Sequence, residues 1–215
     1  MSTQSRLPDA VDYPDSDGKP MAENTRQYQW IVTIKGNLDA IFANDPHVFV
    51  ARDNLVYAQQ GDPKIVKAPD VYVAFGRPKG HRGSYKVWAE EGIFPQVVFE
   101  VLSPGNNDRE MVKRRKFYEK YGAEEFYIID PDYMTLEVWL RIENRLVPPR
   151  IGGEFVSPRL GVRFHVTDDD LILFGPNGQQ FLDFPDILKL RDQEKARADR
   201  LAAKLRSLGI DLETV

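Results

Sequence analysis

Two acidic residues lie in or beside apolar segments of the chain, where an isolated charge is costly. Asp70 follows Pro69 and immediately precedes the apolar segment 71–75, and Glu100 lies inside the apolar segment 97–102. A strongly basic segment, predicted to be a helix, follows the second of these. Two carboxylates on neighbouring strands, with cations on the next helix, suit a hard divalent metal and phosphodiester hydrolysis.

Each carboxylate also has a structural interpretation. Asp70 can be a turn residue at the start of a strand, and Glu100 can be paired with a cation, because a carboxylate in so apolar a strand must be compensated. Four other residues near strand ends, turns or a helix start are interpreted structurally rather than as ligands: Glu23, Asp53, His81 and Asp130.

The basic segment has helical signals at both ends. Asn107 followed by Glu110 matches a capping box that starts a helix at Asp108, and Gly122 is a typical C-terminal cap. At 100° per residue, Glu110 and Arg114 fall within an apolar arc, which comprises Met111, Phe117, Tyr118 and Tyr121. We expect these two charged residues to contact each other, as an i,i+4 ion pair, or to point at a polar site.

Two groups of cations could contact nucleic acid. The loop 76–86 carries Arg77, Lys79 and Arg82 without an acidic residue, and Lys113 and Lys116 lie on the outer side of the helix. The loop is interpreted either as a phosphate-contacting element or as a solvated loop. A net charge of −4 gives no global attraction to nucleic acid, so any binding would rest on such local patches.

Composition limits the chemistry that is available. The chain has 215 residues, of which 42% are hydrophobic and 11% aromatic, as in a globular protein with a real core. The absence of cysteine excludes disulfides, thiolate metal sites and cysteine nucleophiles, and three widely spaced histidines do not form a zinc pattern. The N-terminal residues contain no apolar run long enough for a signal peptide or membrane span, which favours a cytoplasmic protein without membrane contact.

The elements that must position these residues alternate between helices and strands. The pattern predicts a helix at 25–43, started by Asn24 and Gln27, and the helix at 108–121. Strands are predicted at 48–51, 71–75, 97–102, 126–129 and 136–141, with shorter strands beyond. This order indicates an α/β domain over residues 21–186, preceded by an extended arm at 1–20.

The C-terminal segment 187–215 is charged and helical, with Leu201, Leu205 and Leu208 on one face. This tail is expected either to dock on the domain or to pair with a second copy, giving a homodimer.

The order and spacing of these motifs resemble the Uma-type family of restriction endonucleases. The resemblance rests on Pro69-Asp70, the segment 98–106 around Glu100, the helix from Glu110 to Tyr118, the segment 121–127 and Asp130-Pro131. It extends from Tyr13 to Asp211. Each motif alone is common, and their combination is what carries the likeness.

Membership implies the PD-(D/E)xK fold, a mixed β-sheet flanked by α-helices. It implies that Asp70, Glu100 and the backbone carbonyl of Val101 hold Mg²⁺ or Mn²⁺. The motif lysine would fall at Leu102, and related sequences place it on the next helix, where this chain has Arg114. Arginine can neutralise a pentavalent phosphate but remains protonated, so it is unsuited to act as a general base.

The sequence therefore predicts a metal-dependent endonuclease that acts on DNA, with Asp70, Glu100 and Arg114 as its catalytic residues. An alternative keeps the fold without the chemistry: an inactive module that binds nucleic acid or protein, or serves as a dimeric scaffold. The absent motif lysine leaves both interpretations open.

Overall fold

The structure is a computed structural model that describes residues 11–16, 18 and 24–208. Residues up to Phe181 form one compact unit and residues from Leu182 onward form a second, and each is considered by itself. The helices are α1 (Thr25–Ile41), α2 (Asp108–Tyr121) and α3 (Phe184–Ser207), with a short 3-10 helix at Val87–Ala89. None of these described helices has the length and apolar character needed to cross a membrane.

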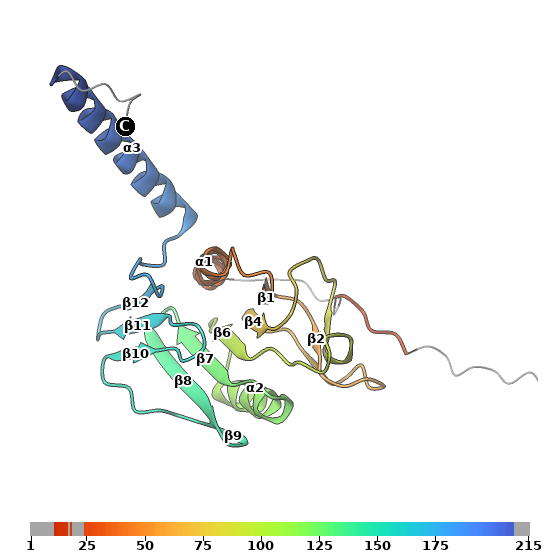
Figure 1. The fold of residues 1–215 in the computed structure, drawn as a ribbon. Coiled ribbons are helices and arrows are strands. Elements are labelled where there is room, and N and C mark those ends of the chain that lie inside the picture. The colour runs from red at the N-terminus through yellow and green to blue at the C-terminus, as the bar shows by residue number, and fades with distance from the viewer. Residues whose placement is uncertain (1–10, 17, 19–23, 209–215) are drawn as a thin grey trace, which may run out of the picture. The chain divides into compact units, whose positions relative to one another are not determined.

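The first unit is built on a six-stranded mixed sheet in the order β1-β4-β6-β7-β8-β9 (Figure 1). Its strands are β1 (Val48–Arg52), β4 (Val71–Phe75), β6 (Val97–Val101), β7 (Glu125–Asp130), β8 (Thr135–Ile142) and β9 (Arg145–Val147). Among the six described strands of this sheet, only β6 and β7 form a parallel pair, and α2 provides the crossover that a parallel pair requires. The predicted mixed sheet with flanking helices is confirmed.

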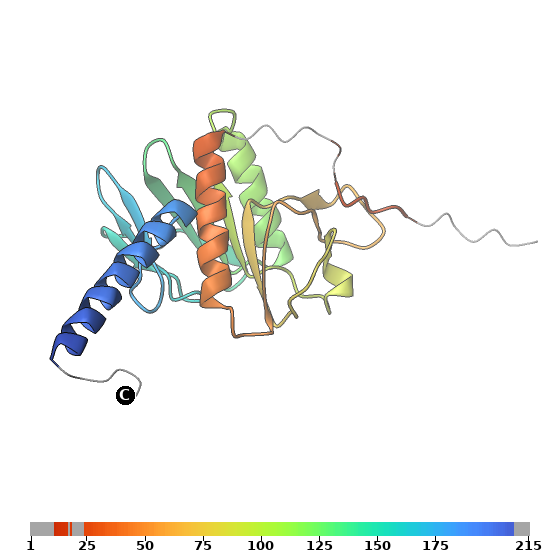
Figure 2. The same ribbon diagram turned by 90° about the horizontal axis from the view of Figure 1, so that it is seen from above.

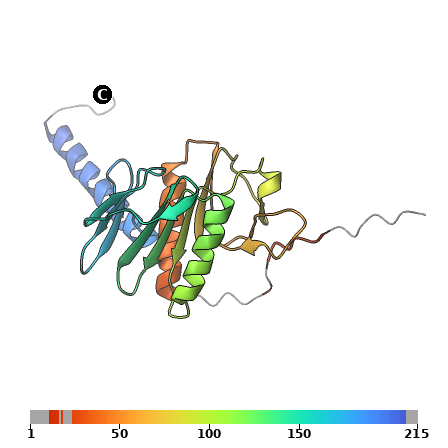
Figure 3. The same cartoon turned by 90° about the horizontal axis from the view of Figure 1, so that it is seen from below.

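The two helices of this unit cover opposite faces of the sheet. Figure 2 shows α1 lying across one face, and Figure 3 shows α2 across the other. Successive residues of β6 alternate between the two cores: Phe99 packs with Ile34 and Leu38 of α1, whereas Val98 packs with Tyr118 of α2. Residue 100 therefore points to the face that α2 covers.

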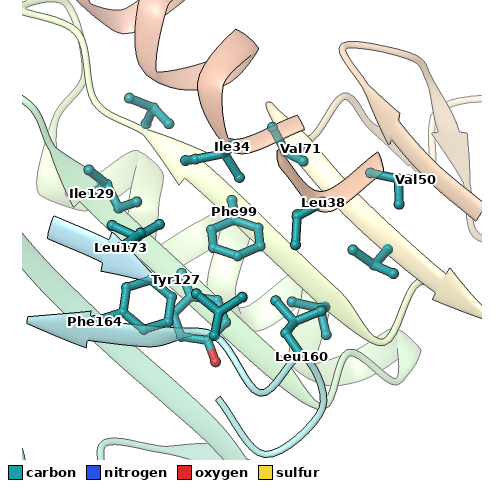
Figure 4. Close-up of a cluster of buried hydrophobic side chains, with 14 of the residues drawn as sticks. Ile34, Leu38, Val50, Val71, Phe99, Tyr127, Ile129, Leu160, Phe164 and Leu173 are labelled. Carbon is teal, nitrogen blue, oxygen red and sulfur yellow. The ribbon is translucent and has the colours of Figure 1, made fainter. Parts of the chain in front are cut away.

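Two small three-stranded sheets extend these layers. The sheet of β10 (Glu154–Val156), β11 (Arg163–Val166) and β12 (Leu171–Phe174) adds side chains to the core on the α1 face, where Figure 4 shows Phe164 and Leu173 beside Phe99 and Tyr127. The sheet of β3 (Val66–Lys67), β2 (Val56–Tyr57) and β5 (Tyr85–Lys86) contributes Val56 and Tyr85 to the core on the α2 face. Each face of the central sheet thus has its own aromatic core, and truncating a ring such as Phe99 would cost about 3–5 kcal/mol.

A buried carboxylate fastens the β10–β11 connection to the central sheet. Glu125 of β7 is 1% exposed and accepts hydrogen bonds from the Tyr127 hydroxyl at 2.6 Å, the Ser157 hydroxyl at 2.5 Å and the Arg159 backbone N–H at 2.6 Å. Burial raises the pKa of Tyr127 well above its ordinary value, so the phenol remains a hydrogen-bond donor. This network satisfies a charge that would otherwise destabilise the core.

The helix caps explain why α1 and α2 begin where they do. The Asn24 side chain accepts from the backbone N–H groups of Arg26 and Gln27, and the Asn107 side chain accepts from that of Glu110. Gly122 closes α2 with φ 110°, a left-handed conformation that favours glycine. The predicted starts of both helices are confirmed, and α1 ends at Ile41 rather than at residue 43.

Residues 11–16 and 18, the described part of the expected N-terminal arm, contain no helix or strand, and residues 13–15 contact β2 and the segment before β5. The Tyr13 ring lies 5.2 Å from that of Tyr57 and 4.8 Å from that of Trp88. The Tyr57 hydroxyl donates to the Pro14 carbonyl at 2.7 Å, and Ser84 donates to Asp15 at 2.7 Å. These contacts hold the segment against the domain.

Candidate active site

The sheet register brings Asp70 and Glu100 together. Val71 pairs with Phe99 in the antiparallel β4–β6 ladder, so Asp70, one residue before β4, lies beside Glu100, one residue further along β6. β4 begins at Val71, and the Pro69 carbonyl before it accepts from the Asp53 backbone N–H. The Asp70 side chain continues the contact with β6, because its Oδ2 accepts from the Val101 backbone N–H at 2.6 Å. The two predicted carboxylates therefore occupy one site at the ends of two central strands.

Glu100 is held by two donors from α2. Its side chain is 4% exposed, and its Oε1 lies 2.8 Å from Nη1 of Arg114 and 2.5 Å from the hydroxyl of Tyr118. Arg114 and Tyr118 stand four residues apart, on the same face of α2, and so reach the same oxygen. These donors compensate the charge that the sequence placed in an apolar strand.

Arg114 links three segments of the chain at this point. Besides Glu100, its guanidinium contacts Oε1 of Glu110 at 3.2 Å and donates to the carbonyl of Ala68, two residues before Asp70, at 3.0 Å. The two interpretations offered for this residue both hold, since it forms the i,i+4 pair and also points at the polar site. Its side chain keeps 21% of its surface exposed.

Burial governs the protonation behaviour of this cluster. It raises the pKa of the Glu100 carboxyl above its ordinary value, although Arg114 and Tyr118 favour the charged form and work against the shift. Burial is the largest single influence on Arg114 and disfavours its charge, but Glu100 and Tyr118 together outweigh burial and raise the arginine pKa. The pKa of Tyr118 lies well above its usual value because of burial and the adjacent carboxylate. Arg114 and Tyr118 therefore remain donors at every physiological pH.

Gln27 of α1 contributes to the site from the opposite face of the sheet. Its side-chain Nε2 donates to the Val101 carbonyl at 2.8 Å. A capping box would turn the side chain of Gln27 back toward the N-terminus of α1. The structure instead joins α1 to the strand end that carries Glu100.

The oxygen donors at this site are of the kind that a hard divalent cation prefers. They are the Asp70 and Glu100 carboxylates and the Val101 carbonyl. Within the described ranges, no cluster of three or more His, Cys, Asp or Glu residues forms a metal site. The chemistry of the donor set fits Mg²⁺ or Mn²⁺, and each of the three groups also has a protein donor bonded to it.

The cations predicted in the loop 76–86 have partners of their own. Arg77 is 7% exposed and pairs with Glu91 at 2.8 Å, and Lys79 donates to the Phe42 and Ala43 carbonyls at the end of α1. Arg82 pairs with Glu90 at 2.5 Å, and its guanidinium carbon lies 4.0 Å from the centre of the Phe49 ring. The loop has no acid of its own, and Glu90 and Glu91 of the following turn supply the counter-charges.

The outer face of α2 presents its lysines to solvent. Lys113 and Lys116 are both exposed and immediately neighbour Arg114 or Arg115 in the sequence. Arg115 itself lies over the Trp139 ring of β8, with 3.7 Å between its guanidinium carbon and the ring centre. The helix therefore has Arg114 in the site, Arg115 over a ring of β8, and four exposed cations, which are Arg109, Lys113, Lys116 and Lys120.

The remaining candidates occupy turns and loops. Asp130 accepts from the backbone N–H groups of Asp132 and Tyr133 and so forms a turn, as predicted. Asp53 follows β1 with φ 46°, in a strand-end turn, and His81 is exposed in the loop after β4. Glu23 lies outside the described residues.

Sequence reasoning missed two residues of the cluster. Tyr118 was counted among the apolar residues of α2, and its spacing of four from Arg114 was the available signal. Gln27 was counted as a capping residue, and no local pattern indicates a partner 74 positions away. Leu102, at the position of the motif lysine, packs against the core on the α2 face instead of entering the site.

The chain matches one known protein family and resembles a solved structure. A family model described as "Uma2: Putative restriction endonuclease" matches residues 6–169, so the expected resemblance is confirmed over that range. A solved structure described as a "putative nuclease belonging to DUF820 from Anabaena variabilis ATCC 29413" is 16% identical, with 66% of this chain and 78% of that chain covered at a TM-score of 0.48. No curated protein matches the sequence. Because the family model matches well over half of the 215 residues, the chain belongs to the Uma2 family, described as "Putative restriction endonuclease".

Proposed function

We propose that this protein is a metal-dependent endonuclease that hydrolyses phosphodiester bonds of DNA. The observation that carries the proposal is the convergence of Asp70, Glu100 and Arg114 at the ends of β4 and β6. Two carboxylates and a cation within one cluster are the groups that phosphodiester hydrolysis requires, and family membership supports a nuclease.

Asp70, Glu100 and the Val101 carbonyl would hold Mg²⁺ or Mn²⁺ as hard oxygen ligands. A divalent ion bound there would supply a water of lowered pKa and a Lewis acid for the phosphate oxygens. The protein fixes the orientation of the ligands beforehand. Asp70 is oriented by the Val101 N–H, Glu100 by Tyr118, and the Val101 carbonyl by Gln27.

Arg114 would stabilise negative charge on the phosphate as the reaction proceeds. Its guanidinium remains protonated, so it binds and neutralises without accepting a proton. Its bonds to Glu100, Glu110 and the Ala68 carbonyl hold it beside Glu100, and such preorganised charge is a major source of rate acceleration.

The exposed Lys113 and Lys116 on α2 would contact DNA phosphates and make affinity depend on salt. The contacts predicted for Arg77, Lys79 and Arg82 stay predictions, since each side chain would have to exchange a protein partner for a phosphate. A homodimer would suit cleavage of both strands of a duplex.

A second function is favoured by a specific observation at the same site. Glu100 Oε1 is bonded to Arg114 and Tyr118, and the motif lysine position is an apolar Leu102. A site neutralised in this way would suit a module that binds nucleic acid or protein without cleaving. The cation that replaces the lysine would then have a structural role.

Metal binding and cleavage measured on the same variants distinguish the two functions. We would titrate Mg²⁺ and Mn²⁺ calorimetrically into the wild type, Asp70→Asn and Glu100→Gln, and then assay plasmid nicking in the same buffers. Asp168→Asn, an exposed loop carboxylate, serves as the control.

The nuclease proposal expects metal binding and nicking in the wild type and control, with both lost in the two site variants. A wild type that binds neither metal overturns it. Binding without nicking in the wild type favours the non-cleaving module.

A further inference from the structure

The C-terminal unit consists of one long helix with an apolar stripe. α3 has 24 residues and is therefore about 36 Å long. None of the described residues of α3 is buried: Ile187 is 45% exposed, Leu190 48% and Leu201 57%. Helices in proteins gain most of their stability from packing an apolar face, so this stripe calls for a partner.

The stripe follows a heptad pattern with two charges at its centre. Spacings of three and four residues connect its members, which are Ile187, Leu190, Glu194, Arg197, Leu201, Lys204 and Leu208. Glu194 and Arg197 face the same side and form a 3.7 Å ion pair within the helix. A partner must therefore accommodate one acid and one base in the middle of an otherwise largely apolar seam.

We propose that α3 pairs with α3 of a second copy of this chain in an antiparallel two-stranded coiled coil. In the register that we assign, Leu190 lies against Leu201 of the second copy, and Glu194 lies against Arg197 of the second copy. Because of the two-fold axis, each contact occurs twice. Two central layers then contain a Glu194–Arg197 pair each, and a Leu190–Leu201 layer lies on either side of them. At the ends, Ile187 lies against the aliphatic stem of Lys204 of the other helix.

Charge complementarity selects this arrangement over a parallel one. In a parallel pair in register, equivalent positions meet, so Glu194 would face Glu194 and Arg197 would face Arg197. Like charges at the centre of a seam are strongly unfavourable, whereas the antiparallel register matches each charge with its opposite. A second copy thus provides what the stripe requires, and the proposal stands independently of any nuclease activity.

Cross-linking of the full-length chain tests the orientation directly. The protein has no cysteine, so Leu190→Cys and Leu201→Cys each introduce a single thiol. After mild oxidation, the antiparallel register expects little disulfide dimer from either variant alone and abundant dimer from their mixture. Dimers formed by each variant alone would show parallel pairing and overturn the proposal. A wild type that is monomeric by light scattering also overturns it, and would mean that the stripe packs elsewhere.

A charge exchange tests the central layers. Glu194→Arg and Arg197→Glu each place like charges opposite one another, so each should raise the dimer dissociation constant by more than about tenfold. The double variant restores opposite charges and should return the constant close to the wild-type value. Asp199→Arg makes the same charge change nearly opposite the stripe and should leave dimerisation unaltered. Equal weakening by Asp199→Arg, or no rescue by the double variant, would contradict the assigned register.

Discussion

The guanidinium of Arg114 lies 2.8 Å from a Glu100 oxygen on a side chain that is 4% exposed. Removing one partner of such a pair leaves a buried charge without its counter-charge. We expect Arg114→Met to lower the free energy of unfolding by about 3–5 kcal/mol, measured by urea denaturation. The double variant Glu100→Leu/Arg114→Met should lose much less. Arg191→Met, in an exposed pair, is the control, and an Arg114→Met loss no larger than the control's would contradict the pairing.

The hydroxyl of Tyr118 is the second donor to Glu100 and is fully buried. Tyr118→Phe removes this donor with little change in packing, so we expect a loss of about 1.5–3 kcal/mol, as for a hydrogen bond to a charged group. Differential scanning calorimetry would measure the loss. Tyr133→Phe changes a ring that is 77% exposed and should have almost no effect. Equal effects of the two substitutions would show that the Tyr118 hydroxyl contributes nothing to stability.

The raised pKa of Glu100 predicts a particular pH dependence of stability. In the unfolded chain this carboxyl titrates near 4.5, and in the folded protein it titrates at higher pH. Between the two values the folded state holds the proton more often. Protonation of Glu100 therefore stabilises the folded state. This contribution is fully present below pH 4.5 and is lost as pH rises through the folded pKa.

The side chain of the Glu100→Gln variant does not titrate. The free energy of unfolding of the wild type minus that of the variant should therefore fall as pH rises above 4.5. Urea denaturation across that range would measure it, with Asp168→Asn as the reference for an exposed carboxyl. A difference that increases with pH would mean that the ion pair with Arg114 outweighs burial.

If DNA is the substrate, the two exposed lysines of α2 should control the salt dependence of binding. Removing a phosphate contact lowers the slope of log affinity against log salt by about 1. We therefore expect Lys113→Ala/Lys116→Ala to lower the slope by about 2 in fluorescence anisotropy titrations. Lys64→Ala/Lys195→Ala removes the same charge from other exposed positions. Similar slopes for both double variants would indicate nonspecific attraction rather than contacts on α2.

Local signals predicted the central elements of the fold well. Asn24, Asn107 and Gly122 marked helix ends because capping depends on a few adjacent residues. The apolar run around Glu100 predicted a buried strand, and the arc of α2 predicted an inward Arg114. These features follow from periodicity, which is a property of short segments.

Contacts between distant segments could not be predicted in the same way. The bond from Gln27 to Val101 depends on how α1 crosses the sheet, and the partners of Arg77 and Arg82 depend on how the turn at Glu90 and Glu91 folds back. The small sheet of β2, β3 and β5 joins segments of two residues each, too short to carry a pattern. Tertiary packing decides such pairings, and no single segment encodes it.

The hydrogen bond from the Val101 N–H to Asp70 makes one backbone amide a reporter of the whole cluster. That amide is shielded from solvent exchange by a side chain rather than by a neighbouring strand. Its proton would exchange with deuterium when Asp70 moves away, even while the sheet stays intact. A short carboxylate bond also shifts an amide proton resonance. An NMR signal from Val101 would thus follow ligand entry into the cluster without any label on the ligand.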